Sequence, residues 1–242
     1  MGWLDWILEK LFGFLPAGDR ADAVDLETLA SYVDQIKSMY QTEGMYSLAV
    51  SIPVKDITLK KPLKKFLEES DPVLNVKNML NNNEVYVGRR VVAAKVLKPL
   101  NGRVEHAESR VVDQLDALFT NQEENNQDML LFYVYASPCV EHCLQTKPPG
   151  SILDRINKIR QWQSYAVVFS EVFQPRDQND AVPYDKLRAA LLLLGNHQGP
   201  RGQIGLDHVF RCKKSEGSGL MECISCANGN QVAHECISNF PR

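Results

Sequence analysis

The chain lacks an apolar run long enough to cross a bilayer, lacks a visible internal repeat, and lacks a large excess of charge of either sign. A membrane-spanning helix needs about 20 mostly apolar residues, so no membrane span is predicted. The 27 basic and 30 acidic residues leave a formal net charge of −3. That balance argues against a protein that wraps nucleic acid with its whole surface, but it allows a local basic groove.

The N-terminal segment is a poor match to a secretory signal peptide, which is an alternative interpretation but not the favoured one. Acidic and basic residues interrupt its apolar residues, and no basic stretch precedes them, although Ala21-Asp22-Ala23 resembles a cleavage site. On a helix, Trp3, Ile7 and Leu11 would share one face. We therefore expect an amphipathic helix packed on the core, with contact to a partner or to a membrane surface as the alternative.

Apolar periodicity predicts alternating helices and strands over the rest of the chain. The run MLLFYVYA at 129–136 is apolar throughout, as a central strand buried on both faces should be. Alternation from residue 84 onward predicts an α/β layered fold with a partly parallel sheet. Helices are expected at 26–44, 106–119, 151–163 and 183–195, strands at 46–54, 84–97, 129–136 and 164–173, and an insertion at about 55–84.

Two short motifs contain the residue types of a catalytic zinc site. Cys139 and Cys143 are four residues apart and would project from one face of a helix, with Pro138 just ahead of its first turn. A catalytic zinc has three protein ligands and one open position, and His106 supplies the third ligand. Glu108 then remains for carrying a proton between water and a leaving amine, which is general acid–base catalysis.

The spacing of His106 and Glu108 sets a geometric condition. Side chains two residues apart point about 200° apart on a regular helix, so these two converge only in an irregular first turn. The order of both motifs, with a strand before the cysteine pair, matches the H-x-E…P-C-x-x-C pattern of zinc deaminases. The competing interpretation is two buried core thiols and a surface His-Glu pair.

On these motifs the chain resembles the cytidine deaminase superfamily, and most closely its AID/APOBEC-like branch, over roughly residues 45–210. A group of vertebrate deaminase-like proteins, some described as secreted, is also similar. The resemblance implies a three-layer α/β fold with a five-stranded mixed sheet flanked by helices. It implies zinc held by His106, Cys139 and Cys143, with Glu108 as proton shuttle and hydrolysis of cytosine to uracil as the reaction.

Two departures from the branch pattern bear on substrate choice. Ala136 stands where a Trp is common, and three residues instead of two separate the cysteines. The resemblance still implies single-stranded DNA or RNA as substrate, with Arg103, Tyr135 and Ser137 as candidate substrate contacts. Core packing is the competing interpretation of the tyrosine. Free cytidine or deoxycytidine is the alternative substrate, and a catalytically inactive deaminase-fold binding module is the alternative function.

Four further cysteines lie in a Gly- and Ser-rich tail, at Cys212, Cys223, Cys226 and Cys236. In an oxidising compartment they would form two disulfides, and three pairings are then open. In the cytosol they could instead hold a structural zinc, although their spacing is irregular for a zinc finger and slightly favours disulfides. The compartment, cytoplasmic or secreted, is left open by these opposing signals.

Three segments are therefore expected. Residues 1–44 hold the N-terminal amphipathic helix, a linker and the first helix, and residues 45–210 hold the zinc-dependent deaminase domain with its insertion. Residues 211–242 form the Cys-rich C-terminal tail. A disulfide-stapled secreted protein whose function lies in that tail is a further alternative.

Overall fold

The computed structural model describes residues 24–53, 62–100, 102, 104–120, 128–139, 144, 151–175 and 181–239. The predicted N-terminal amphipathic helix, Arg103 and Cys143 lie outside these described residues. The largest feature is a sheet of strands β1 (Tyr46–Pro53), β2 (Tyr86–Val87), β3 (Val91–Lys95), β4 (Asp128–Ala136), β5 (Ser164–Glu171), β6 (Val209–Lys214) and β7 (Met221–Ser225).

The strands lie in the order β2-β3-β1-β4-β5-β6-β7. The β4–β5 and β5–β6 pairs are parallel and the other pairs antiparallel, which confirms the predicted partly parallel sheet. The sheet has seven strands where five were expected. The two additional strands are at the edges, because β2 pairs with β3 for two residues and the Cys-rich tail adds β7 to β6. The predicted boundary at 210/211 falls inside β6.

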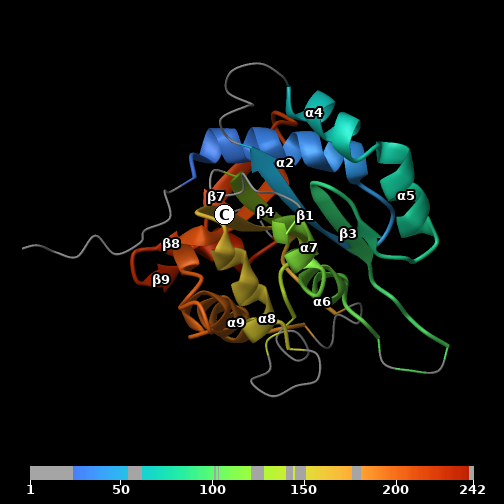
Figure 1. Cartoon of the computed structure of the whole chain (residues 1–242). Helices are drawn as coiled ribbons and strands as arrows, with labels where there is room; N and C mark the ends of the chain where they lie inside the picture. Colours follow the sequence, from blue (N-terminus) through green and yellow to red (C-terminus); the bar gives the residue numbers. More distant parts are fainter. Residues whose placement is uncertain are drawn as a thin grey trace, which may run out of the picture.

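Helices cover both faces of the sheet, giving three layers (Figure 1). One face packs against α2 (Leu26–Tyr40), α4 (Leu63–Ser70) and α5 (Val73–Asn81). The other packs against α6 (Ala107–Val112), α7 (Leu115–Thr120), α8 (Leu153–Ile156) and α9 (Tyr184–Asn196). None of the described helices is both long and apolar enough to cross a membrane.

Local features of the sequence explain where α2 begins and why β4 is the central strand. Helix α2 begins after Asp25, whose carboxylate accepts a hydrogen bond from Thr28 N at 2.8 Å, a standard N-cap. Strand β4 lies between β1 and β5 in the middle of the sheet, and its residues from Asp128 to Val134 are all buried. That burial on both faces confirms the interpretation of the continuous apolar run.

Several predicted elements are interrupted. The strand expected at 84–97 splits into β2 and β3, which meet at a turn through Gly88. The helix expected at 106–119 splits into α6 and α7, and the one at 151–163 into α8 and the 3₁₀ helix η2 (Asn157–Gln161). Part of the predicted insertion forms α4 and α5.

Candidate active site

His106 and Glu108 converge at the start of α6. An isolated bridge between Leu97 and Glu105, with both N···O distances 2.9 Å, holds the chain just before the helix. His106 is the N-cap residue, with extended backbone angles of φ −71° and ψ 145°, and Glu108 lies in the first turn. His106 Nδ1 is consequently 3.5 Å from Glu108 Oε1. The geometric condition set by the i, i+2 spacing is met.

Cys139 approaches the same histidine from the end of β4. Its Sγ lies 3.7 Å from His106 Nδ1, and the residue is buried in the apolar cluster beneath α6 to α9. Two ligands of one tetrahedral zinc, bonded at about 2.0 Å for N and about 2.3 Å for S, are about 3.5 Å apart. The Nδ1–Sγ separation therefore suits two ligands of a single zinc ion.

A carboxylate and a thiol lie beside the imidazole of His106. The pKa of His106 is raised to about 10 by hydrogen bonding to Cys139 first and to the carboxylate of Glu108 second, against the opposing effect of burial. Glu108 is itself only 5% exposed. A buried place with a carboxylate and a sulfur ligand on one ring favours a positive charge there, whether a proton or a metal cation.

The described residues supply two of the three predicted zinc ligands. Over those residues, no group of three or more His, Cys, Asp or Glu side chains is placed to hold a metal. The third predicted ligand, Cys143, lies outside the described residues. One nitrogen and one sulfur ligand are nevertheless the types that zinc takes, so the residues present fit a zinc ion.

Ser137, just after β4, is hydrogen-bonded to the end of β5 and to the chain that follows it. Its backbone N donates to Glu171 O at 2.8 Å, and its Oγ accepts from Phe173 N at 2.9 Å. Ser137 is buried, and Pro138 and Cys139 follow it directly. The Ser137 hydroxyl oxygen thus has a structural partner, and its predicted contact with substrate stays a prediction.

Tyr135 and Cys139 belong to different faces of the sheet. The Tyr135 ring lies 6.1 Å from the ring of Tyr46, centroid to centroid, and Tyr46 packs in the cluster beneath α2. Cys139 packs on the α6 to α9 side. Tyr135 is 38% exposed. Its role in substrate binding, like that of Arg103, stays a prediction.

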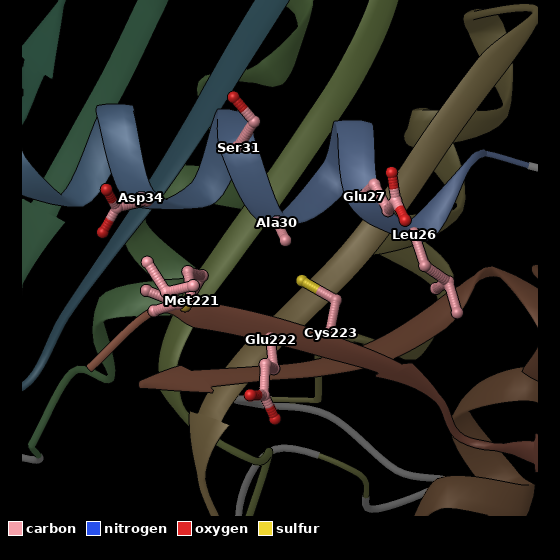
Figure 2. A pocket seen from close by; sticks show the side chains of 9 residues that line it. Leu26, Glu27, Ala30, Ser31, Asp34, Met221, Glu222 and Cys223 are labelled. Carbon is pink, nitrogen blue, oxygen red and sulfur yellow. The ribbon is translucent and has the colours of Figure 1, made fainter. Parts of the chain in front are cut away.

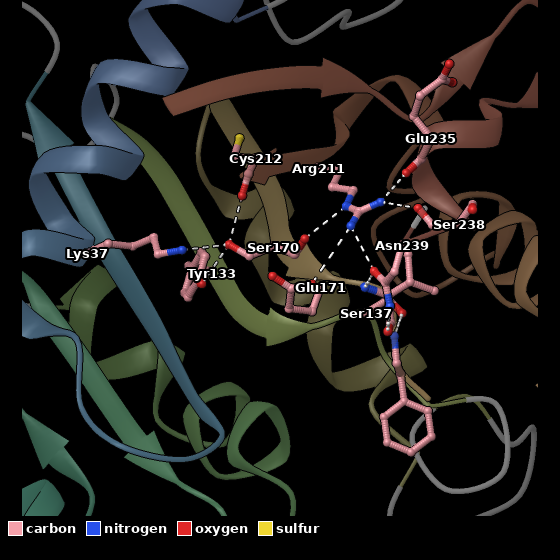
Figure 3. A network of polar contacts seen from close by, with 12 residues as sticks. Lys37, Tyr133, Ser137, Ser170, Glu171, Arg211, Cys212, Glu235, Ser238 and Asn239 are labelled. Atoms are coloured by element: carbon pink, nitrogen blue, oxygen red, sulfur yellow. Dashed lines mark hydrogen bonds and ion pairs between the residues drawn. The ribbon is translucent and has the colours of Figure 1, made fainter. Parts of the chain in front are cut away.

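Sequence reasoning missed a polar network beside this site (Figure 3). The buried guanidinium of Arg211 in β6 binds backbone oxygens of both β5 and the tail, and the side chain of Asn239 in the tail binds the chain after β5. An arginine inside the otherwise apolar start of the strand, Val-Phe-Arg-Cys, was the one available signal. Nothing in the sequence marks Asn239, because its partner is 67 residues away.

The tail cysteines form two disulfides, Cys212–Cys223 and Cys226–Cys236. Cys212 stands opposite Cys223 in the register of β6 and β7. Their sulfurs are therefore bonded to one another, which is the first of the two alternatives predicted for the tail. Two disulfides fit an oxidising compartment.

Two surface hollows lie elsewhere. One, of about 430 Å³, runs between α2 and β7, with Ala30 and Met221 among its apolar lining residues and Glu27, Asp34 and Glu222 among its acidic ones (Figure 2). The other, of about 1100 Å³, surrounds the start of β5. Neither set of described lining residues includes His106, Glu108 or Cys139.

Comparison with known proteins gives one kind of match. The model of a protein family described as Secreted Novel AID/APOBEC-like Deaminase 1 matches residues 26–240. No curated protein and no solved structure matches the chain. The family match begins at the first residue of α2 and includes the disulfide-bonded tail as well as both deaminase motifs.

Proposed function

We propose that this chain, which belongs to the AID/APOBEC-like deaminase family described as Secreted Novel AID/APOBEC-like Deaminase 1, is a zinc-dependent enzyme that converts cytosine to uracil. The observation that carries the proposal is the approach of two side chains to one ring nitrogen of His106. Glu108 Oε1 and Cys139 Sγ lie 3.5 and 3.7 Å from the same atom, His106 Nδ1. These are the residue types, in the chain order, that a zinc deaminase uses.

The proposed roles follow from the chemistry of each side chain. His106, Cys139 and Cys143 would hold zinc, which supplies Lewis acidity and makes water nucleophilic near neutral pH. Glu108 takes a proton from the attacking water and passes it to the amino nitrogen of cytosine. A bond from C4 to the water oxygen forms and the bond from C4 to the amino nitrogen breaks. The second proton of the water ends on ring N3, so uracil and ammonia are the products. Burial of Glu108 keeps bulk water from competing for that proton.

We further propose single-stranded DNA or RNA as the substrate. A deaminase reaches its base only when the base is unstacked, and exposed aromatic and basic side chains hold such a strand. Membership of an AID/APOBEC-like deaminase family supports this proposal, and Arg103, Tyr135 and Ser137 are the proposed contacts. Free cytidine is the second candidate substrate.

We also propose that the protein is secreted. The description of the family includes the word secreted, and the two disulfides fit an oxidising compartment. A reducing cytosol would work against both bonds.

The test uses the purified full chain with a cytosine-containing single-stranded oligonucleotide and, in parallel, with free cytidine. Uracil is read by mass spectrometry, and bound zinc is measured in the same samples. Glu108→Gln keeps the size of the side chain but cannot shuttle the proton, so we expect turnover to fall at least about 100-fold. Zinc content should stay the same in that variant.

The substrate that turns over identifies the subclass of deaminase. If zinc is bound but neither substrate gives uracil, the enzyme proposal is wrong and a deaminase-fold binding module replaces it. If uracil forms equally well with Glu108→Gln, the proton-shuttle role is wrong.

A further inference from the structure

The three residues Glu171, Val172 and Phe173 at and just beyond the end of β5 are hydrogen-bonded along both edges. Successive residues of an extended chain present their N–H and C=O groups to opposite edges. On one edge, Glu171 O accepts from Ser137 N and Phe173 N donates to Ser137 Oγ, at 2.8 and 2.9 Å. On the other edge, Val172 faces Asn239 of the tail.

The side chain of Asn239 makes the hydrogen bonds to Val172 that a neighbouring strand would otherwise make. The register of β6 on β5 runs from the Val167–Val209 pair to the Phe169–Arg211 pair, so the ladder ends before Val172. Val172 N donates to Asn239 Oδ1 and Asn239 Nδ2 donates to Val172 O, both at 2.9 Å. Val172 is only 3% exposed, and without this side chain its backbone groups would be left to find other partners in a buried place.

Arg211 fixes the tail to β5 (Figure 3). Its Nε donates to Ser170 O at 2.9 Å, and its Nη2 donates to Asn239 Oδ1 at 2.8 Å. Its Nη1 donates to Glu235 O and to Ser238 O, both at 2.5 Å. One buried guanidinium therefore sets the position of Asn239 relative to the strand that it binds.

The second disulfide also restrains this part of the tail. The Cys226–Cys236 disulfide anchors Cys236, which is the last residue of the 3₁₀ helix η5 (His234–Cys236). Cys236 is three residues before Asn239. The path from the tail to the candidate site is thus continuous. It runs from Asn239 to Val172, through Phe173 to Ser137, and along the chain to Cys139.

We propose that Asn239, held by Arg211, is a positioning residue that keeps Cys139 in place to bind zinc with His106. This inference rests on the proposed zinc-dependent function and adds to it a role for the C-terminal tail. Ser137 is two residues before Cys139, so a shift of the Glu171–Phe173 segment would change the position of the cysteine relative to His106 Nδ1. Removal of a residue that orients a metal ligand typically lowers metal affinity about 10- to 100-fold.

The test measures zinc affinity of the full chain by competition with a chromogenic chelator, independently of any turnover. Asn239→Ala should bind zinc about 10- to 100-fold more weakly than the parent protein. Thermal unfolding and circular dichroism of the same samples report whether the variant is folded. Ser137→Ala, which removes the bond on the opposite edge of the same segment, should weaken zinc in the same direction and serves as a second variant.

The matched control is Asn157→Ala. Asn157 makes the same kind of two-ended clamp, because its Nδ2 donates to Gly202 O and its Oδ1 accepts from Arg201 N, both at 2.6 Å. It lies in η2, ahead of the start of β5 and away from Cys139 along the chain. Asn157→Ala should lower the unfolding temperature and leave zinc affinity unchanged.

The outcomes separate the two proposals. If the parent protein binds zinc and folded Asn239→Ala and Ser137→Ala bind it as tightly, the positioning role is wrong and the proposed function stands. If Asn157→Ala weakens zinc as much as Asn239→Ala, the effect is general loosening, which also overturns the positioning role. If the parent protein binds no stoichiometric zinc, both proposals fall.

Discussion

At the residue scale, the buried carboxylate of Asp71 shows how much one side chain can hold in this fold. Asp71 is fully buried, and its oxygens accept from the backbone N atoms of Arg89 and Arg90 at 2.9 and 2.8 Å and from Tyr86 Oη at 3.0 Å. A Cβ at Gly88 would collide with Asp71 Oδ1, so glycine is required for this close approach. The turn that joins β2 to β3 is built around one carboxylate.

Asp71→Ala should lower the free energy of unfolding by about 2 to 4 kcal/mol, because three donors lose their acceptor in hydrogen bonds that are partly buried. Chemical denaturation measures this change. Asp113→Asn is the comparison, since Asp113 pairs with Arg155 at 2.5 Å but its side chain is 51% exposed. That variant should lose less than about 1 kcal/mol. Equal losses in the two variants would contradict the assigned role of Asp71.

At the element scale, the two disulfides close loops of similar length but lie in different surroundings. Cys212–Cys223 and Cys226–Cys236 span 11 and 10 residues, so each should stabilise the fold by about 3 kcal/mol through loop closure. The first joins β6 to β7, which are also paired by a ladder of backbone hydrogen bonds. The second closes the segment that leads to Asn239.

Serine replacement of both cysteines in either pair should lower the free energy of unfolding by about 3 kcal/mol, as measured by denaturant titration. Zinc affinity should respond differently in the two variants. The Cys226→Ser/Cys236→Ser protein should bind zinc more weakly, whereas Cys212→Ser/Cys223→Ser should keep the parent affinity. Weakened zinc binding in the second variant alone would contradict the path proposed from the tail to Cys139.

At the scale of the whole molecule, the apolar core occupies both sides of the seven-stranded sheet. One cluster lies beneath α2, α4 and α5, and the other beneath α6 to α9. Of the predicted zinc ligands, Cys139 lies in the second cluster, and many apolar side chains surround it. A core of this extent does not depend on a metal for its formation, unlike that of a small zinc domain.

Removing zinc with a chelator should therefore abolish deamination while leaving the far- and near-ultraviolet circular dichroism unchanged. Because a ligand of the native state stabilises it, zinc at 100 times its Kd should raise the free energy of unfolding by about 2.7 kcal/mol. Thermal unfolding with and without zinc measures the difference. Loss of the near-ultraviolet signal on chelation would show that the fold requires the metal.

The sequence by itself determined most of the elements and the residue types of the candidate site, because both depend on local patterns of apolar spacing and short motifs. The spacing of apolar residues predicted α2, and the unbroken apolar run predicted β4 as a central strand. The His106-Ala107-Glu108 and Pro138-Cys139 motifs by themselves indicate the deaminase family, and the family match confirms that resemblance.

Only the tertiary structure decided which distant groups meet. The extended backbone of His106 brings its ring to Glu108, the register of β6 and β7 selects one of three disulfide pairings, and Asn239 reaches Val172 across 67 residues. Such contacts are specified by strand register and chain packing, which depend on the whole fold. Local periodicity does not predict these contacts, because it indicates which face of an element is buried and not which residues cover that face.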